Sequence, residues 1–215
     1  MKIYNVLLLG LICVLMFISS LSRAETADEK EKVSARELWK YVIVDKSRKY
    51  DELISIAKKI ISENNGKPAA LTAELLMGYI EIDRALNDLE ETWDKARAVF
   101  VKLAQNNPQS WQGQAAKISL INMLHLEGKH SEVITESLKS LKEINWDLLG
   151  KDAPQDLADY KKMAGADAEF TPDVLRLFLA KNYFCLKKVD DAKQWALKIE
   201  NADMKRETEE VIKSH

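Results

Sequence analysis

Four segments of the chain place apolar residues at the spacing of one helical face. These stripes lie at residues 53–61, 96–103, 133–141 and 192–199, and charged residues fill many of the positions between them. This is the pattern of an amphipathic helix, whose apolar side has to be buried against a neighbour. The sequence therefore predicts four helices that are each buried on one side.

Three further segments, 69–86, 111–126 and 172–186, are apolar on more than one side. A helix of that kind is covered by several neighbours. Because the two kinds of segment alternate along the chain, we expect antiparallel helix pairs stacked on one another. The chain of 215 residues holds only seven Gly and four Pro, which favours this all-α fold over a turn-rich β fold.

Residues that begin and end helices stand at several of the predicted boundaries. Asn64-Asn65-Gly66 and Gly128 are suited to left-handed caps at helix C-termini. Thr171-Pro172 offers an N-cap residue followed by proline in the first helical turn.

The segment 145–170 interrupts the helical pattern with Gly150, Pro154 and Gly165. A short helix is possible at 155–163. We expect an irregular insertion, which is either a functional loop or a helical insertion packed on the surface. Trp146 lies in this segment and is the candidate for an exposed recognition residue. By contrast, Trp93 and Trp195 fall at helical spacing and are assigned to the core.

The first 24 residues have the pattern of a secretory signal peptide. Lys2 precedes an almost wholly apolar stretch at 3–18, and small residues follow. Ser22-Arg23-Ala24 fits the small-x-small cleavage rule, so the mature chain is predicted to begin at Glu25. The predicted location is the periplasm or the exterior of a bacterial cell.

Two alternatives to cleavage involve the membrane. The apolar stretch is slightly shorter than the roughly 20 residues that span a bilayer, so an uncleaved anchor is the main alternative. A lipoprotein is disfavoured, because Cys13 lacks a small residue just before it. After the leader we expect a flexible tether at 25–33 and one helical domain at 34–215, which opens with the capping-box pair Ser34 and Glu37.

Charge and cysteine content exclude two classes of protein. Without the leader, which holds Lys2 and Arg23 but no acid, 30 basic residues face 34 acidic ones. A chain of this kind lacks the basic surface of a nucleic-acid binder. Once Cys13 leaves with the leader, Cys185 is the remaining cysteine, so the fold is not held by an internal disulfide.

The one-sided helices share the turn that precedes them. The segments 48–53, 91–96, 128–133 and 187–192 align as a tight turn, a large residue, two polar residues and a small or aliphatic one. The large residues are Tyr50, Trp93, His130 and Val189. This alignment indicates an internal repeat of helical hairpins.

The repeated unit resembles the tetratricopeptide repeat family, whose pattern of about 34 residues is W-x2-L-G-x2-Y, then A-x3-F, then P. The residues that carry the likeness are Ala96, Phe100 and Pro108, then Leu179-Ala180, Tyr183 and Ala192, and more weakly Leu120-Ile121, Leu124 and Gly128. The likeness covers residues 48–200 and is degenerate. Equivalent turns stand 37 residues apart from Trp93 to His130 and 59 apart from His130 to Val189.

The resemblance implies a right-handed superhelix of about four repeats, with Ala96 and Ala192 where paired helices touch. In this family the first helix of each pair lines a concave groove. The positions that match it here are Ile118, Asn122, His125, Leu177, Lys181 and Phe184. The implied function is a scaffold that holds an envelope protein or peptide segment and takes no small-molecule substrate. The family's carboxylate clamp is not predicted, because Asn122 stands near Ile118 rather than near a lysine.

Two other functions stay open from the sequence. The first is an accessory helical domain of a cell-wall enzyme system. The second is a membrane-anchored assembly factor, which requires that the leader stays uncleaved.

No residue pattern in the sequence predicts catalysis or a cofactor. His125 and His130 are five residues apart, whereas two metal ligands on one helical face need a spacing of four, so no metal site is predicted. Glycosidase chemistry needs two carboxylates that face each other across a cleft. Side chains of adjacent helical residues point apart instead, so solvated helix faces explain the acid pairs Glu90-Glu91, Asp190-Asp191 and Glu209-Glu210. Cys185 has no nearby histidine to activate its thiol. We therefore expect a protein that is not an enzyme.

Overall fold

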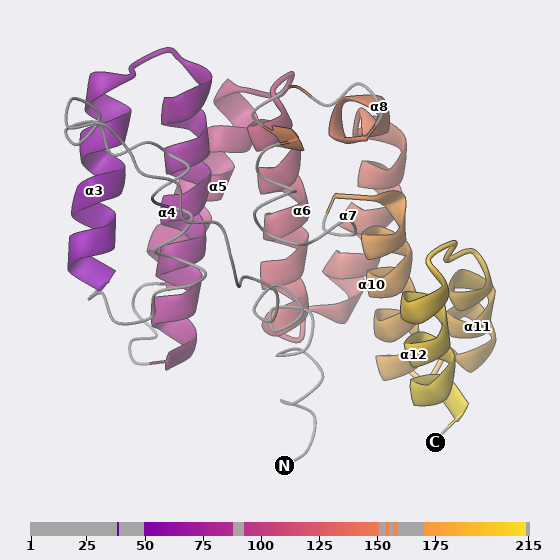
Figure 1. The fold of residues 1–215 in the computed structure, drawn as a ribbon. Coiled ribbons are helices and arrows are strands. Elements are labelled where there is room, and N and C mark those ends of the chain that lie inside the picture. Colours follow the sequence, from indigo (N-terminus) through magenta and orange to yellow (C-terminus); the bar gives the residue numbers. More distant parts are fainter. Residues whose placement is uncertain are drawn as a thin grey trace, which may run out of the picture. The chain divides into compact units, whose positions relative to one another are not determined.

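The computed structural model describes Leu38, Pro154 and the ranges 50–87, 93–150, 157–158 and 170–213. Every regular element among these residues is an α-helix (Figure 1). The helices are α3 (Tyr50–Glu63), α4 (Pro68–Asn87), α5 (Trp93–Asn106), α6 (Trp111–Leu126), α7 (His130–Glu143), α8 (Trp146–Leu149), α10 (Pro172–Cys185), α11 (Val189–Leu197) and α12 (Ala202–Lys213). The predicted all-α class is confirmed.

The chain divides into two compact units, and the boundary lies inside α5. The first unit comprises residues 1–99 and 155–166. Its described part is dominated by the packing of α3 on α4. The tyrosine hydroxyl of Tyr50 donates to Asp83 Oδ2 at 2.9 Å, and Arg84 pairs with Asp51 at 3.0 Å. These contacts join the start of α3 to the end of α4, so the two helices are antiparallel.

The second unit comprises residues 100–154 and 167–215. Along the chain α6 packs on α7, α10 on α11 and α11 on α12, while α7 packs on α10 across the insertion. The central helix α10 also contacts α6 and α12. Figure 1 shows α12 in front of α11 and beside α10. The helices of this unit are thus packed consecutively.

The turn alignment correctly marks where α7 and α11 begin, since His130 and Val189 are their first residues. The described parts of α3 and α5 open at the aligned Tyr50 and Trp93, and the residues just before them lie outside the described ranges. The predicted C-terminal cap at Gly128 is confirmed, since its φ is 71° and its backbone nitrogen donates to His125 O at 3.0 Å. Gly66 also has a left-handed φ, of 75°, but it lies beyond the end of α3, in the turn that Lys67 N closes by donating to Asn64 O. The prediction for Thr171 holds for its position, directly before α10, but its side chain makes no capping hydrogen bond.

The helix α6 is enclosed on several sides, as its sequence predicts. Its first turns are buried around the whole circumference, including the polar Gln112 and Gln114. Ser110 caps the helix, because its Oγ accepts from the backbone nitrogen of Gly113 at 3.0 Å. A Cβ atom at Gly113 would stand 1.9 Å from the carbonyl oxygen of Asn107, so this close approach requires glycine.

The apolar stripe predicted for α7 is displaced around the helix. Ile134, Leu138 and Leu141 are only partly buried, whereas Val133, Ser137 and Ser140 are buried. Small serine side chains at buried positions suit close packing of α7 against its neighbours, which are α6 and α10.

The helix α12 has no counterpart among the predicted elements. Asn201 starts it, because its Oδ1 accepts from the backbone nitrogens of Asp203 and Met204 at 3.1 and 3.0 Å. Its buried residues are Thr208 and Ile212.

Several predictions fall outside the described residues. These are the leader at 1–24 with its cleavage site Ala24/Glu25, the tether at 25–33, and the capping pair Ser34 and Glu37. Most of the predicted helix at 155–163 also lies outside, although residues 157–158 are helical. Within the part of the chain that the structure describes, no helix is both long and apolar enough to cross a membrane.

Candidate interaction surface

The six residues predicted to line a groove form three pairs, each separated by 59 residues, and each pair places one residue on α6 and one on α10. The two helices contact each other. Asn122, His125, Leu177, Lys181 and Phe184 are partly buried. Ile118 is only 5% exposed and belongs to the core. This burial corrects its assignment to an accessible groove.

Phe184, one of the predicted groove positions, also contributes to the packing of this unit. It lies against a cluster of buried residues, Ala180, Ala192, Ala196 and Ile212, together with Tyr183 and Trp195. Ala192 is completely buried, as predicted for a helix contact, and so is Ala96 in the first unit. Trp195 is partly buried, and Lys198 Nζ lies 3.9 Å from the centroid of its ring.

Lys181 is the partly buried cation of this surface. Burial lowers its pKa, while the carboxylate of Glu207 and the thiol of Cys185 act in the opposite direction. Because Glu207 belongs to α12, the interaction brings the missed helix beside the predicted groove on α10. The charge of Lys181 is thus held in a setting where water solvates it only in part.

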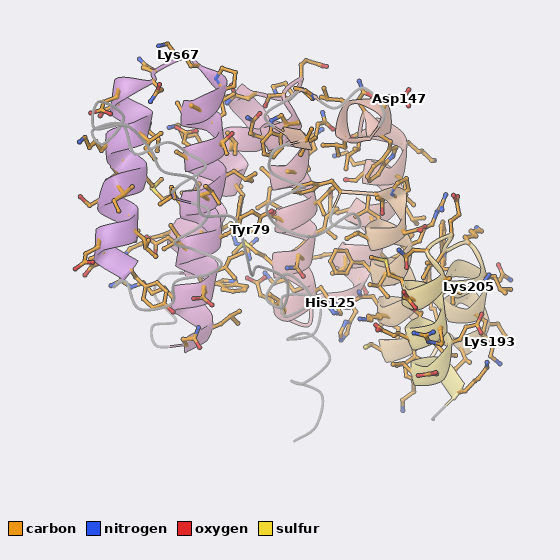
Figure 2. The ribbon with its side chains drawn as sticks, in the orientation of Figure 1. Lys67, Tyr79, His125, Asp147, Lys193 and Lys205 are labelled. Atoms are coloured by element: carbon orange, nitrogen blue, oxygen red, sulfur yellow. The ribbon has the colours of Figure 1, made fainter. Side chains whose placement is uncertain are left out.

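Two histidines converge on one buried amide between α6, α7 and α10. The completely buried Asn182 donates from Nδ2 to the carbonyl oxygen of Phe178 at 2.7 Å. The same Nδ2 lies 3.0 Å from His125 Nδ1, and Asn182 Oδ1 lies 2.7 Å from His130 Nδ1. Figure 2 shows His125 near the end of α6.

Packing and charge both act on His125. Its ring lies against that of Phe178, with centroids 5.4 Å apart. Burial lowers the pKa of His125, a hydrogen bond with Asn182 opposes this, and the charges of Lys181 and His130 lower the pKa further. No group of three or more potential metal ligands occurs among the described histidines, cysteines and carboxylates.

A second buried polar centre was missed by sequence reasoning. Asp173, near the start of α10, is only 6% exposed. Its carboxylate accepts from the backbone nitrogens of Glu200 and Asn201, at 3.0 and 2.7 Å, and pairs with Arg176 at 2.8 Å. Asp173 therefore anchors the turn between α11 and α12 to α10.

Trp146, the candidate recognition residue, is partly buried. It begins α8, and its indole nitrogen donates to the carbonyl oxygen of Leu141 at 3.2 Å. This hydrogen bond turns the ring back towards the end of α7. The polar end of the side chain is thus used within the fold.

The remaining candidates for chemistry have ordinary surroundings. Cys185 is exposed, and partial burial of its thiol raises the pKa, opposed by Lys181. The thiol therefore stays protonated at neutral pH, unlike the activated thiols of cysteine enzymes. Asp190 and Asp191 are exposed in the first turn of α11, where negative charge is favourable. Glu90 and Glu91 lie outside the described residues.

Comparison of the whole chain with protein-family models, with curated proteins and with solved structures finds no match.

Proposed function

We propose that this protein is an exported helical scaffold of the tetratricopeptide type, which holds a segment of another envelope protein. The bound segment lies against α6 and α10 and contacts Asn122 and Lys181. The export and the partner class are inferred from the residue patterns of the chain together with the local geometry.

The observation that carries the proposal is the repeated register of the second unit. The pair α6–α7 and the pair α10–α11 are related by a constant offset: α6 ends at Leu126 and α10 at Cys185, while α7 begins at His130 and α11 at Val189. Both offsets are 59 residues. Stacks of repeated helix pairs present extended surfaces that bind other proteins.

The helix α12 supports the same proposal as the first helix of a further pair. It contacts α10 and α11, as the first helix of a following repeat does in such a stack.

Position-specific crosslinking in intact cells tests the binding face. A photoreactive amino acid is placed at Asn122 or at Lys181, and at the exposed Lys139 of α7 as the matched control. We expect the same partner to be captured from the first two positions and not from the third. Equal capture from all three positions would contradict a defined binding face.

Export is tested separately by the intact mass of the protein from fractionated cells. A chain that begins at Glu25 and occurs in the soluble envelope fraction supports cleavage and export. A full-length chain in the membrane fraction would support the anchored assembly factor instead.

A further inference from the structure

The side chain of Asn182 connects three helices around one turn. His125 lies at the end of α6 and His130 at the start of α7, so both ends of the α6–α7 turn meet the same amide of α10. Asn182 is completely buried, and its Nδ2 is also held by the carbonyl oxygen of Phe178. The amide is therefore a fixed point between the helix pair and α10.

The hydrogen bonds assign opposite protonation patterns to the two rings. Asn182 Nδ2 carries two hydrogens, one for Phe178 and one that a neutral His125 accepts at Nδ1, at the shorter of its two distances to the amide. Asn182 Oδ1 can only accept, so His130 has to carry a proton on Nδ1. A neutral His125 in this arrangement carries its proton on Nε2.

A second proton on His125 disturbs this arrangement. The new Nδ1–H faces an Nδ2–H group, and rotating the amide would bring Oδ1 against the carbonyl oxygen of Phe178. The protonated ring can instead donate to Oδ1, which lies 3.2 Å away and has a second lone pair besides the one that accepts from His130. This bond favours the charged ring and so opposes the effect of burial on the pKa of His125. Asn182 then keeps a buried N–H without its acceptor, which destabilises the packed state.

The surrounding charges act in the same direction. The groups that face His125 from the helices packed beside it are His130 of α7 and the cation of Lys181 on α10. Directly after α6, the carboxylate of Glu127 pairs with Lys129 at 3.0 Å. The carboxylate of Asp147 on α8 is remote, because Asn145, just before α8, contacts Gln114 at the opposite end of α6. The two charges that act on the pKa of His125, Lys181 and His130, both lower it.

We propose that His125, Asn182 and His130 form an acid-sensitive latch, which holds the α6–α7 pair to α10 at neutral pH and releases it in mild acid. The latch has access to solvent, because His130 lines an open depression of about 240 Å³ with Gly128, Lys129, Ser131, Glu132 and Leu186. The consequence is a scaffold whose packing responds to the pH of its surroundings.

Denaturant unfolding of the full chain at about pH 7.5 and about pH 5.5, on either side of the ordinary histidine pKa, tests the latch. The variant His125→Asn keeps an acceptor near the position of Nδ1 but cannot titrate, and His215→Asn is the control at the third histidine. We expect wild type and His215→Asn to lose more of their unfolding midpoint on acidification than His125→Asn does. An equal loss in all three proteins would overturn the proposal.

Nitrogen-detected NMR of the wild-type imidazole rings gives a readout that does not depend on the variants folding. At neutral pH we expect the Nε2–H form for His125 and the Nδ1–H form for His130. On acidification, the amide resonances of Asn182 should shift together with the protonation of His125. An Nδ1–H form of His125 at neutral pH, or Asn182 resonances that ignore its titration, would overturn the latch.

Discussion

Gly128 and Lys187 occupy the same position at the ends of α6 and α10, and both have left-handed backbone conformations, with φ of 71° and 61°. The hydrogen bonds around them also match. Gly128 N donates to His125 O at 3.0 Å, and Lys187 N donates to Phe184 O at 2.9 Å. One repeat thus uses the residue that suits this conformation, whereas the other places a lysine in it at a cost of about 1–2 kcal/mol.

Exchanging these residues tests the strain directly. We expect Lys187→Gly to stabilise the fold by up to about 1 kcal/mol, because release of the left-handed strain exceeds the greater freedom of glycine in the unfolded chain. Gly128→Ala should destabilise it by about 1 kcal/mol through the backbone alone, since a Cβ atom there meets nothing within 4 Å. Urea unfolding measures both, and shifts of the same sign would contradict this assignment.

Buried alanines report on the close contacts between helices. Ala96 and Ala192 are completely buried, whereas Ala98, two residues from Ala96 on α5, is exposed. We expect Ala96→Leu and Ala192→Leu to overpack their sites and cost about 1–3 kcal/mol, and Ala98→Leu to cost little. Thermal or chemical unfolding of the three proteins checks this. Similar midpoints for Ala96→Leu and Ala98→Leu would mean that the contact can expand.

Asp173 is expected to control the position of α12. In Asp173→Ala the backbone nitrogens of Glu200 and Asn201 lose their acceptor, which should cost about 1–3 kcal/mol. Hydrogen exchange should then rise at the first turn of α12. The control is Asp203→Ala, because Asp203 pairs with Arg206 on the exposed surface and such pairs contribute little. Unchanged exchange in Asp173→Ala would show that packing alone holds α12.

The helix boundaries of the second unit were predictable because their signals are local. The apolar residues of 111–126 coincide with α6, and the aligned turns place the first residues of α7 and α11. At Gly128 the residue type alone predicts a left-handed cap, because glycine favours that conformation. At Lys187 the residue type predicts no such cap, and only the alignment with Gly128 identifies the turn.

The polar centres could not be predicted because their partners are distant in the sequence. Asn182 is one asparagine within a helical pattern, and it stands 57 and 52 residues from His125 and His130. Asp173 similarly accepts from nitrogens 27 and 28 residues away. The helix α12 was missed for a local reason, since a strongly polar segment that buries Thr208 and Ile212 shows only a narrow apolar stripe.

Lys181 separates the stability of the fold from the proposed binding. Methionine matches the length of lysine but carries no charge, so Lys181→Met removes a partly desolvated cation together with its attraction to Glu207. We expect its unfolding midpoint to equal or exceed that of wild type, while crosslinking from position 122 to the partner falls at least about tenfold, the loss that roughly 1.4 kcal/mol of binding free energy produces.

The matched control is Lys193→Met, because Lys193 is exposed on α11 (Figure 2) and should preserve both stability and crosslinking. Two results would oppose the proposed role. If the unfolding midpoint falls in Lys181→Met but not in Lys193→Met, the attraction between Lys181 and Glu207 is a structural contact that holds α12. Full crosslinking by a folded Lys181→Met protein would place the binding surface elsewhere on the scaffold, because a lysine at the centre of the bound face contributes through a charge that methionine cannot supply.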